Sequence, residues 1–393
     1  MIETILSELT LNITDGKHGD CKDKENSGFY FISCKDVRGG QIHYECARQI
    51  AEEDFQDTHK RTQLEPNDIL VTNSGTIGRM AFVTESPLTG RTTFQKSVAI
   101  VKPDTGKVLP KYLYYQLQNC VSEFINQSNG SAQKNLLLST MRSFKMRIHE
   151  DKETQARIAR VLSAYDDLIE NNQKQIKLLE EAAQRLYEEW FVDLRFPGYE
   201  NTKIVDGVPE GWKMCTLSQI AEIVMGQSPK SEFYNQDGAG LPFHQGVGSY
   251  GERFVVDTVY STSTTRIAEA GSILFSVRAP VGRLNITQNK IIIGRGLAAI
   301  NHKAGMQSYL FYLLKERFFK DNIIGNGSIF AAISKNELMG INFLIPSSDI
   351  VEKFNGIASD IDGKIAIIIK QIASLGEARD RLLPRLMGDA ENF

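Results

Sequence analysis

Leu64–Arg79 (LEPNDILVTNSGTIGR) and Ala268–Arg283 (AEAGSILFSVRAPVGR) align without gaps at an offset of 204 residues. They share an Ile-Leu pair and a closing Gly-Arg pair at matching places. Further blocks match in the same order at offsets that fall from 211 to 196: Leu6-Ser7 with Leu217-Ser218, Gln95–Ala99 with Gly294–Ala298, Gly130-Ser131 with Gly327-Ser328, and Ser163, Asp166, Ile169 with Ser359, Asp362, Ile365. Ordered blocks with slowly changing spacing are typical of a duplication, so the sequence predicts two copies of one unit.

The composition is that of an ordinary globular protein. The chain has 393 residues, 41% hydrophobic and 24% charged, which is enough for two or three domains. No apolar run approaches the roughly 20 residues that span a bilayer, and the N-terminal residues lack the basic-then-apolar order of a signal peptide. The five cysteines are irregularly spaced, with no CxxC pair, so we expect a cytoplasmic protein without a structural metal site.

Charge is distributed unevenly along the chain. The net charge is −3, yet residues 212–345 hold 13 basic and 9 acidic side chains, and 270–315 contain no acidic residue. The first copy has a similar acid-free stretch at 124–149. Local positive fields of this kind favour a polyanionic partner, although scattered solvated lysines on an ordinary surface would give the same counts.

Each copy ends in a long helical stretch with apolar residues at alternating spacings of four and three, which is the seam of a left-handed coiled coil. The seam positions are Ile158, Leu162, Tyr165, Ile169, Asn172, Ile176, Leu179, Ala183, Leu186 and Trp190, and the same positions 196 residues later. We expect helices at 151–192 and 346–393 to pair in antiparallel fashion along about 50 Å, with the globular units at opposite ends. Alternatively, each helix packs only on its own domain.

Residues 1–150 and 212–345 are predicted to be mixed α/β (α+β) domains, and 193–211 has the Pro, Gly and Asn of a linker. Strands are expected at Ile69–Thr72, Met80–Thr84, Ser97–Val101, Ile273–Val277, Leu284–Thr287, Lys290–Ile293 and Leu297–Ile300. Helices are expected at Pro110–Gln127 and Met306–Asp321. Their tyrosines and phenylalanines have the spacing of core residues, although stacking on bases remains an alternative.

The sequence contains no phosphate-binding loop, no zinc-protease motif and no hydrolase nucleophile motif. Pro103-Asp104 with Glu150-Asp151-Lys152 fits a loose nuclease pattern, but its acidic residues have no counterpart in the second copy. We therefore expect that this chain is not itself an enzyme.

Four features together resemble the specificity subunit of Type I restriction–modification systems. They are the repeated Ile-Leu…Gly-Arg block, the helix pair, Pro209-Glu210-Gly211-Trp212, and Leu382–Met387. The resemblance covers essentially the whole chain. It implies two target recognition domains that each read half of a bipartite DNA site, and a helix pair that sets the half-site spacing and docks two methyltransferase subunits. It also implies restriction subunits as partners, with S-adenosylmethionine and ATP/Mg bound by those partner subunits and no cofactor in this chain. The alternative is a coiled-coil scaffold or a stand-alone DNA-binding protein without a restriction role.

The candidate DNA-binding residues are basic, amide and hydroxyl side chains in the loops of both copies. They are Lys17, Lys35, Arg38, Asn73, Thr76, Arg79, Arg91 and Lys96 in the first copy, and Gln227, Lys230, Gln245, Tyr250, Arg253, Arg278, Arg283 and Arg295 in the second. Arg79 with Arg283, and Lys96 with Arg295, hold equivalent places, which favours phosphate or structural roles. The loop Gly246–Gly251 is either a flexible reading loop or an ordinary surface loop. Trp190, Phe191 and Leu386 are candidates for partner contact, or they complete the intramolecular core.

Overall fold

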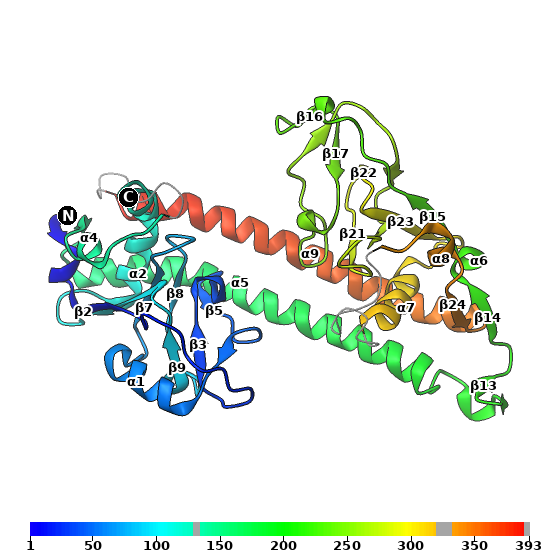
Figure 1. Cartoon of the computed structure of the whole chain (residues 1–393), viewed down its shortest axis with the longest axis horizontal. Coiled ribbons are helices and arrows are strands. Elements are labelled where there is room, and N and C mark those ends of the chain that lie inside the picture. The colour runs from blue at the N-terminus through cyan, green and yellow to red at the C-terminus, as the bar shows by residue number, and fades with distance from the viewer. Residues whose placement is uncertain (129–133, 320–331, 389–393) are drawn as a thin grey trace. The chain divides into compact units, whose positions relative to one another are not determined.

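The computed structural model describes residues 1–128, 134–319 and 332–388. The chain divides into two compact units, Met1–Asn171 with Gln371–Phe393, and Asn172–Lys370. Both divisions fall inside the long helices α5 (Lys152–Tyr187) and α9 (Ser348–Leu386). Each unit therefore combines one globular part with a portion of each helix (Figure 1). The matched Gly130-Ser131 and Gly327-Ser328 lie outside the described residues.

The first unit is organised around an antiparallel sheet with the strand order β2-β10-β7-β8. Its strands are β2 (Thr10–Asp15), β10 (Val98–Pro103), β7 (Ile69–Thr72) and β8 (Met80–Phe82). Successive residues of β7 point to opposite faces, so Ile69 and Val71 enter one core and Leu70 enters another. Because both faces are covered, the strand is a continuous apolar run.

The second unit repeats this sheet in the order β15-β23-β20-β21. Its strands are β15 (Ala221–Met225), β23 (Leu297–His302), β20 (Ile273–Ser276) and β21 (Leu284–Ile286). Ile273 and Phe275 face one core and Leu274 the other, as in β7. The identical strand order confirms the predicted duplication, and the predicted strands are present with ends that shift by one or two residues.

Smaller sheets complete each unit. In the first unit, β1 (Ile2–Ile5) pairs with β11 (Lys145–Ile148), β4 (Val37–Arg38) with β5 (Gln41–Ile42), and β6 (Arg48–Gln49) and β9 (Thr92–Phe94) flank β3 (Tyr30–Ile32). In the second unit, β14 (Lys213–Thr216) pairs with β24 (Asn342–Ile345), β12 (Ile204–Val205) with β13 (Val208–Pro209), and β16 (Tyr234–Asn235), β18 (Tyr260–Ser261), β17 (Leu241–His244), β22 (Ile291–Ile293) and β19 (Ile267–Ala268) form one sheet. The β3–β9 and β17–β22 pairs are both parallel, which extends the internal symmetry to this layer.

A β-bulge in β2 explains one of the changes in the residue-number offset between equivalent positions of the two copies. Lys102 pairs with Asn12 and Pro103 with Thr10, so Leu11 is an extra residue on that strand. The equivalent pairing of β15 with β23 runs without interruption. One residue inserted at the bulge therefore changes the offset between the copies from 211 to 210.

The shorter helices cover the sheets. They are α1 (Glu52–Thr62), α2 (Pro110–Asn119), α3 (Val121–Asn126), α4 (Leu138–Arg142), α6 (Leu217–Ile220), α7 (Gln307–Phe319) and α8 (Lys335–Met339). The single helix predicted at Pro110–Gln127 is wrong in one respect, because the chain leaves helical geometry at Cys120. That break lets Phe124 enter the first core. The predicted helical aromatics, including Tyr112 and Tyr309, are buried core residues and offer no face to a base.

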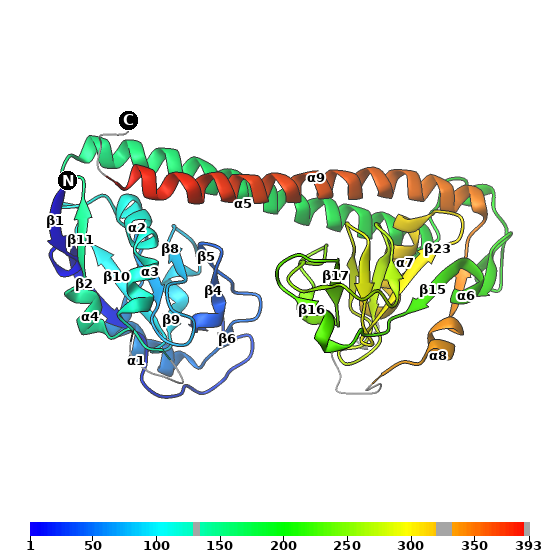
Figure 2. The same ribbon diagram turned by 90° about the horizontal axis from the view of Figure 1, so that it is seen from above.

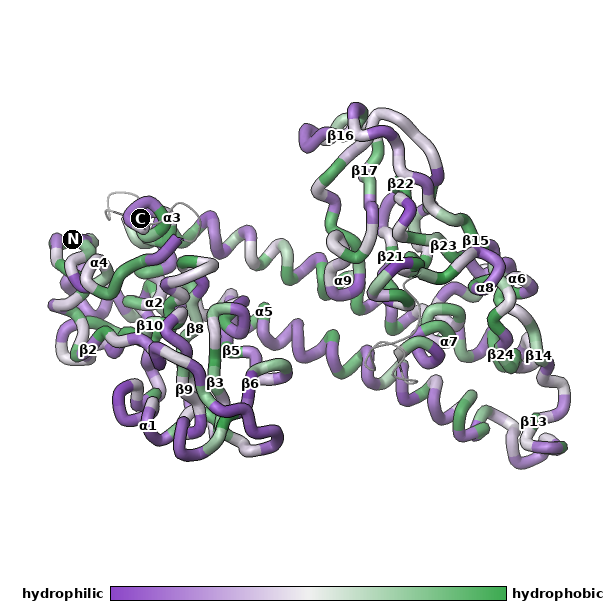
Figure 3. Tube along the Cα trace, in the orientation of Figure 1, coloured by the Kyte–Doolittle hydropathy of each residue, from purple (hydrophilic) through white to green (hydrophobic). Residues whose placement is uncertain are grey.

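The long helices pair through the predicted seam, whose described positions are all buried or half-buried. In the first unit, Ile158 and Leu162 of α5 share a core with Leu386 near the end of α9. In the second unit, Ala183 near the end of α5 shares a core with Phe354 near the start of α9. The pairing is therefore antiparallel, as predicted, and in each unit the two helices lie side by side (Figure 2). Hydrophobic and hydrophilic residues alternate along both helices (Figure 3). After α5 the chain continues as a π-helical turn, Glu188–Val192.

Candidate nucleic-acid interface

The repeated Gly-Arg pair ends a turn that joins two strands in each unit. Thr72 Oγ1 accepts the N–H of Arg79 at 2.9 Å, and Ser276 Oγ accepts the N–H of Arg283 at 2.8 Å. Gly78 and Gly282 have φ values of +87° and +88°, a region that side chains with a Cβ rarely adopt. The motif thus fixes the backbone of the turn, and the side chains of Arg79 and Arg283 lie at the surface.

Substitution of Gly78 by alanine is expected to lower the free energy of unfolding by about 2–3 kcal/mol. A Cβ there would lie 2.5 Å from Val121 Cγ1, so an overpacking cost adds to the cost of a positive φ. Gly39→Ala is the matched control, because its φ is +58° and nothing lies within 4 Å of the added atom. Urea unfolding of both variants separates the two costs, and equal losses would contradict the predicted clash.

Some of the predicted residues of the first copy meet at one edge of its central sheet. In the antiparallel register Asp15 pairs with Ala99 and Thr72 with Val98, so the ends of β2 and β7 adjoin the start of β10. A cleft of about 600 Å³ lies at this edge, lined by Asp15, His18, Asn73, Ser74, Lys96 and Asn135–Ser139. Two of the predicted DNA-binding residues, Asn73 and Lys96, therefore share one cleft.

Asn73 is the buried amide of this cleft. Its backbone N–H donates to Ser97 O at 3.1 Å, and its carbonyl accepts the N–H of Leu136 at 2.8 Å, so the residue is held from both sides. Its side-chain oxygen is buried without a hydrogen-bond partner among the described residues. An unpaired buried oxygen costs free energy, and it belongs to a residue that lines the cleft. The equivalent residue in the second unit is Val277, whose carbonyl accepts the N–H of Ile333 in the same way.

The charges around the cleft are partly neutralised. Lys17 forms ion pairs with Asp54 at 2.9 Å and Asp57 at 3.5 Å in α1. The hydrogen bond to Asp54 raises the pKa of Lys17. Asp15 similarly accepts from His18 at 2.9 Å. Lys17 thus holds α1 against the end of β2, which leaves Lys96 as the exposed cation of the cleft.

The same edge of the second unit gathers Gln227, Arg278 and Arg295, the counterparts of Lys17, Ser74 and Lys96. Gln227 N–H donates to Ile293 O at 2.9 Å, as Lys17 N–H donates to Phe94 O at 2.8 Å. Arg278 and Arg295 are exposed, and neither forms an ion pair within the described chain. Gln245 lies beside them and accepts a hydrogen bond from Ser228 Oγ at 2.7 Å. The acid-free stretch therefore places unneutralised cations at this edge.

Two predicted DNA contacts are corrected by the structure. Arg253 is 4% exposed and forms ion pairs with Glu180 and Asp362 in the helix pair. The hydroxyl of Tyr250 is buried without a hydrogen-bond partner among the described residues, and burial raises the pKa of this group. The guanidinium of Arg253 and the hydroxyl of Tyr250 are thus both buried, although the rest of the Tyr250 side chain is half-buried. The loop Gly246–Gly251 that precedes Arg253 is held by Ser249, which hydrogen-bonds the buried His244 at 2.8 Å.

The remaining predicted residues are exposed but do not form one cluster. Thr76 lies in the turn before Arg79, and Lys230 pairs with Glu232 at 3.7 Å. Lys35, Arg38 and Arg91 lie on other short segments of the first unit. Their roles in DNA contact stay predictions.

The predicted partner-binding residues pack in or against intramolecular cores, which favours the alternative that they complete the core. Trp190 is buried against Phe354, with ring centroids 5.9 Å apart, and Phe191 packs on the same ring at 5.0 Å. Leu386 is buried in the first unit beside Met387. Trp190 and Leu386 therefore complete intramolecular cores, and Phe191, which is half-buried, packs against the same aromatic cluster as Trp190.

Sequence reasoning did not identify Asn135 and Ser139, which line the first cleft. The acid-free stretch 124–149 marked their neighbourhood, but no local pattern pointed to these residues. The same reasoning did not identify His244, whose Nε2 lies 2.9 Å from Asp257. Burial lowers the pKa of His244.

In the described parts of the chain, no helix has the length and apolar character needed to cross a membrane.

Comparison with known proteins places the chain in a family. The type I restriction modification DNA specificity domain matches residues 11–181 and again 209–378, so the chain belongs to this family. The type I restriction enzyme MjaIX specificity subunit of Methanocaldococcus jannaschii is 29% identical over 339 residues, 81% of this chain and 76% of the relative. The HindI specificity subunit of Haemophilus influenzae is 24% identical over 366 residues, 73% of this chain and 79% of the relative. The crystal structure of the type I S subunit from M. genitalium shares the fold, with a TM-score of 0.59 at 16% identity over 99% of this chain and 96% of that one.

Proposed function

We propose that this chain is the DNA specificity subunit of a type I restriction–modification complex. Each globular domain reads one half of a split DNA target. The helix pair sets the half-site spacing and docks two methyltransferase subunits. Restriction subunits join the complex, and the partners bind S-adenosylmethionine and ATP with Mg²⁺.

One observation carries the proposal. The two units present the same sheet edge with different side chains at equivalent places, namely Lys17 and Gln227, Asn73 and Val277, and Ser74 and Arg278. A protein that reads two unequal half-sites needs the same backbone framework twice, with different base-contacting side chains in each copy. A purely structural protein without a DNA role has no need of amides and cations at both edges. The family match and the relatives named as specificity subunits support the same reading.

A catalytic role for this chain has little support. Lys152 of the loose nuclease pattern donates to the carbonyls of Thr105 and Gly106, each at 2.8 Å. Asp104 in turn accepts the N–H of Gly106 at 3.0 Å. These residues stabilise a turn before α2, so we propose that catalysis resides in the partner subunits.

The direct test is co-expression of the chain with a type I methyltransferase subunit, followed by purification of the complex and mapping of methylated sites in host DNA. We expect a split target of two short unequal half-sites that disappears when this chain is omitted. A stable complex without sequence-specific methylation would leave only a scaffold role.

Asn73→Ala is expected to relax specificity at one base of a single half-site. Loss of an amide that reads a base costs about 1–3 kcal/mol, a 5- to 150-fold loss of discrimination. The second half-site should be unchanged. Asn12→Ala, at an exposed asparagine within β2 and three residues before Asp15, is the matched control and should alter neither half-site. Binding measured with single-base variants of both half-sites decides the matter, and an equal loss on every sequence would contradict base reading by Asn73.

A further inference from the structure

Each unit contains one aspartate of the helix pair that accepts a hydrogen bond from a tyrosine of the adjoining domain. Tyr115 of α2 donates to Asp166 of α5 at 2.6 Å. Tyr312 of α7 donates to Asp362 of α9 at 3.0 Å. Asp166 and Asp362 are equivalent at the offset of 196, so the duplication has preserved this contact in both units.

Each aspartate also pairs with an arginine, but the two arginines come from different elements. Asp166 pairs with Arg379 of α9 at 2.7 Å, which is a contact between the two helices. Asp362 pairs with Arg253, which lies in a loop of the second domain. The same ion pair is therefore made from the helix in one unit and from the domain in the other.

The equivalent positions show that the arginine has been exchanged. The counterpart of Arg379 in the second unit is Ala183, which is fully buried. The counterpart of Arg253 in the first unit is Gly40. Arg253 O accepts the N–H of Ile286, and Gly40 O accepts the N–H of Phe82, the residue equivalent to Ile286. The first unit thus has a glycine in the domain loop and an arginine on the helix, whereas the second unit has an arginine in the loop and an alanine on the helix.

The surroundings of each position fit its occupant. Gly40 has a φ of +81°, and a Cβ there would lie 3.1 Å from Tyr114 Oη, so a side chain at this position would be strained and crowded against that tyrosine. In the second unit, the Arg253 guanidinium carbon lies 4.2 Å above the ring of Phe311, the counterpart of Tyr114. Glu180 adds a second carboxylate 3.4 Å from Arg253, where the first unit has Gly376.

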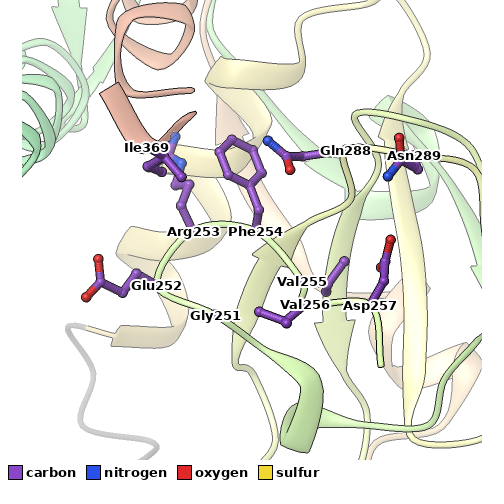
Figure 4. A pocket seen from close by; sticks show the side chains of 10 residues that line it. All are labelled: Gly251, Glu252, Arg253, Phe254, Val255, Val256, Asp257, Gln288, Asn289 and Ile369. Carbon is purple, nitrogen blue, oxygen red and sulfur yellow. The ribbon is translucent and has the colours of Figure 1, made fainter. Parts of the chain in front are cut away.

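Burial of Arg253 makes these pairings obligatory. Desolvation acts to lower the pKa of Arg253, but the carboxylates of Asp362 and Glu180 together with Tyr312 outweigh it and raise the pKa. A buried guanidinium keeps its charge only where such partners surround it. The loop that carries Arg253 also lines a cleft of about 460 Å³ with Ile369 of α9, so it adjoins the helix (Figure 4).

We propose that Arg253 is the positioning residue that fixes the second domain on the helix pair, and that Arg379 fulfils the equivalent charge requirement from within the helix pair of the first unit. The residue at this loop position of a domain and the residue at the facing helix position therefore depend on each other. A domain with arginine at this loop position requires alanine on the helix, and a domain with glycine there requires arginine on the helix. This inference concerns the seating of a domain and does not depend on the DNA-binding proposal.

The test moves the arginine within the full-length chain. Arg253→Gly removes the domain arginine, and Arg253→Gly with Ala183→Arg transfers the arrangement of the first unit into the second. Hydrogen exchange followed by mass spectrometry is read at residues 251–257 and 359–366, with β20 as the internal reference. Arg253→Gly is expected to raise exchange at least tenfold in both segments and to leave β20 unchanged. The double variant is expected to restore protection.

Two controls keep the outcome decisive. Arg253→Met retains an apolar stem over Phe311 but removes the charge, so it should also lose protection if the ion pairs fix the loop. Ala183→Arg alone adds a second buried cation and should lower protection. Unchanged exchange in Arg253→Gly and Arg253→Met, or a double variant no better than Arg253→Gly, would overturn the proposal. DNA binding by the unaltered chain is measured in a separate experiment. If the exchange changes as expected but the unaltered chain does not bind DNA, the proposal on Arg253 stands and only the DNA-reading proposal fails.

Discussion

Removal of one heptad from each long helix, residues 171–177 and 368–374, is expected to shorten the preferred spacing between half-sites by about three base pairs. The pairing of Asp166 with Arg379 shows the antiparallel register of the two helices in the first unit, and deletions of equal length in both helices preserve that register. Seven residues at 1.5 Å rise shorten each helix by about 10 Å, and DNA rises about 3.4 Å per base pair. Because whole heptads are removed, the seam keeps its face and the half-sites themselves should be unchanged.

The control deletes residues 204–209, which form the β12–β13 hairpin. Glu210 N–H donates to Lys203 O at 2.8 Å, so the chain can close across the deletion. This variant should keep the original spacing. Methylation mapping with the co-expressed methyltransferase measures both variants. Unaltered spacing after heptad removal would show that the helix pair does not act as a ruler.

Phe354→Ala is expected to cost about 3–5 kcal/mol of the free energy of unfolding. Phe354 is fully buried at the start of α9, and its ring contacts Phe191 at 5.0 Å, Tyr187 at 5.7 Å and Trp190 at 5.9 Å between centroids. The truncation removes the ring on which the end of α5 packs, and the surrounding aromatic rings can only partly close the resulting cavity.

The control is Ile357→Ala on the same helix, where the side chain is 44% exposed. It should cost less than about 1 kcal/mol, because little apolar surface is lost. Urea unfolding followed by tryptophan fluorescence compares the two variants. Similar losses would mean that the aromatic cluster does not hold the helix end.

The framework of the fold could be predicted because its signals are local. The buried strand Ile69–Thr72 and its repeat at Ile273 are continuous apolar runs bounded by turn residues, and the seam of α5 repeats over many turns. The break at Cys120 could not be predicted, because it depends on Phe124 finding space in the core.

The candidate site was only partly predictable. Asn73, Lys96, Gln227, Arg278 and Arg295 follow or precede framework strands, so the strand register brings them to one edge of each sheet. Arg253 has the same local character, a basic residue in a glycine-rich loop. Its burial depends on Asp362, 109 positions away, and no local pattern contains that information. Trp190 and Phe191 are similar, because their partner Phe354 lies in the other long helix.

The core of the first unit joins residues from opposite ends of the sequence, since Leu386 and Met387 pack in the same cluster as Leu6. Such a contact has a very high sequence separation, and it forms late in a chain made from its N-terminus. At about 5–20 residues per second, a ribosome needs roughly 10–40 s to make the 200 or so residues between the first-unit part of α5 and the part of α9 that covers it. During that time Ile158 and Leu162 lack the cover of α9, so nascent chains on one messenger are exposed to mispairing through this seam. Synthesis of the second unit thus sets the time at which the first one can close.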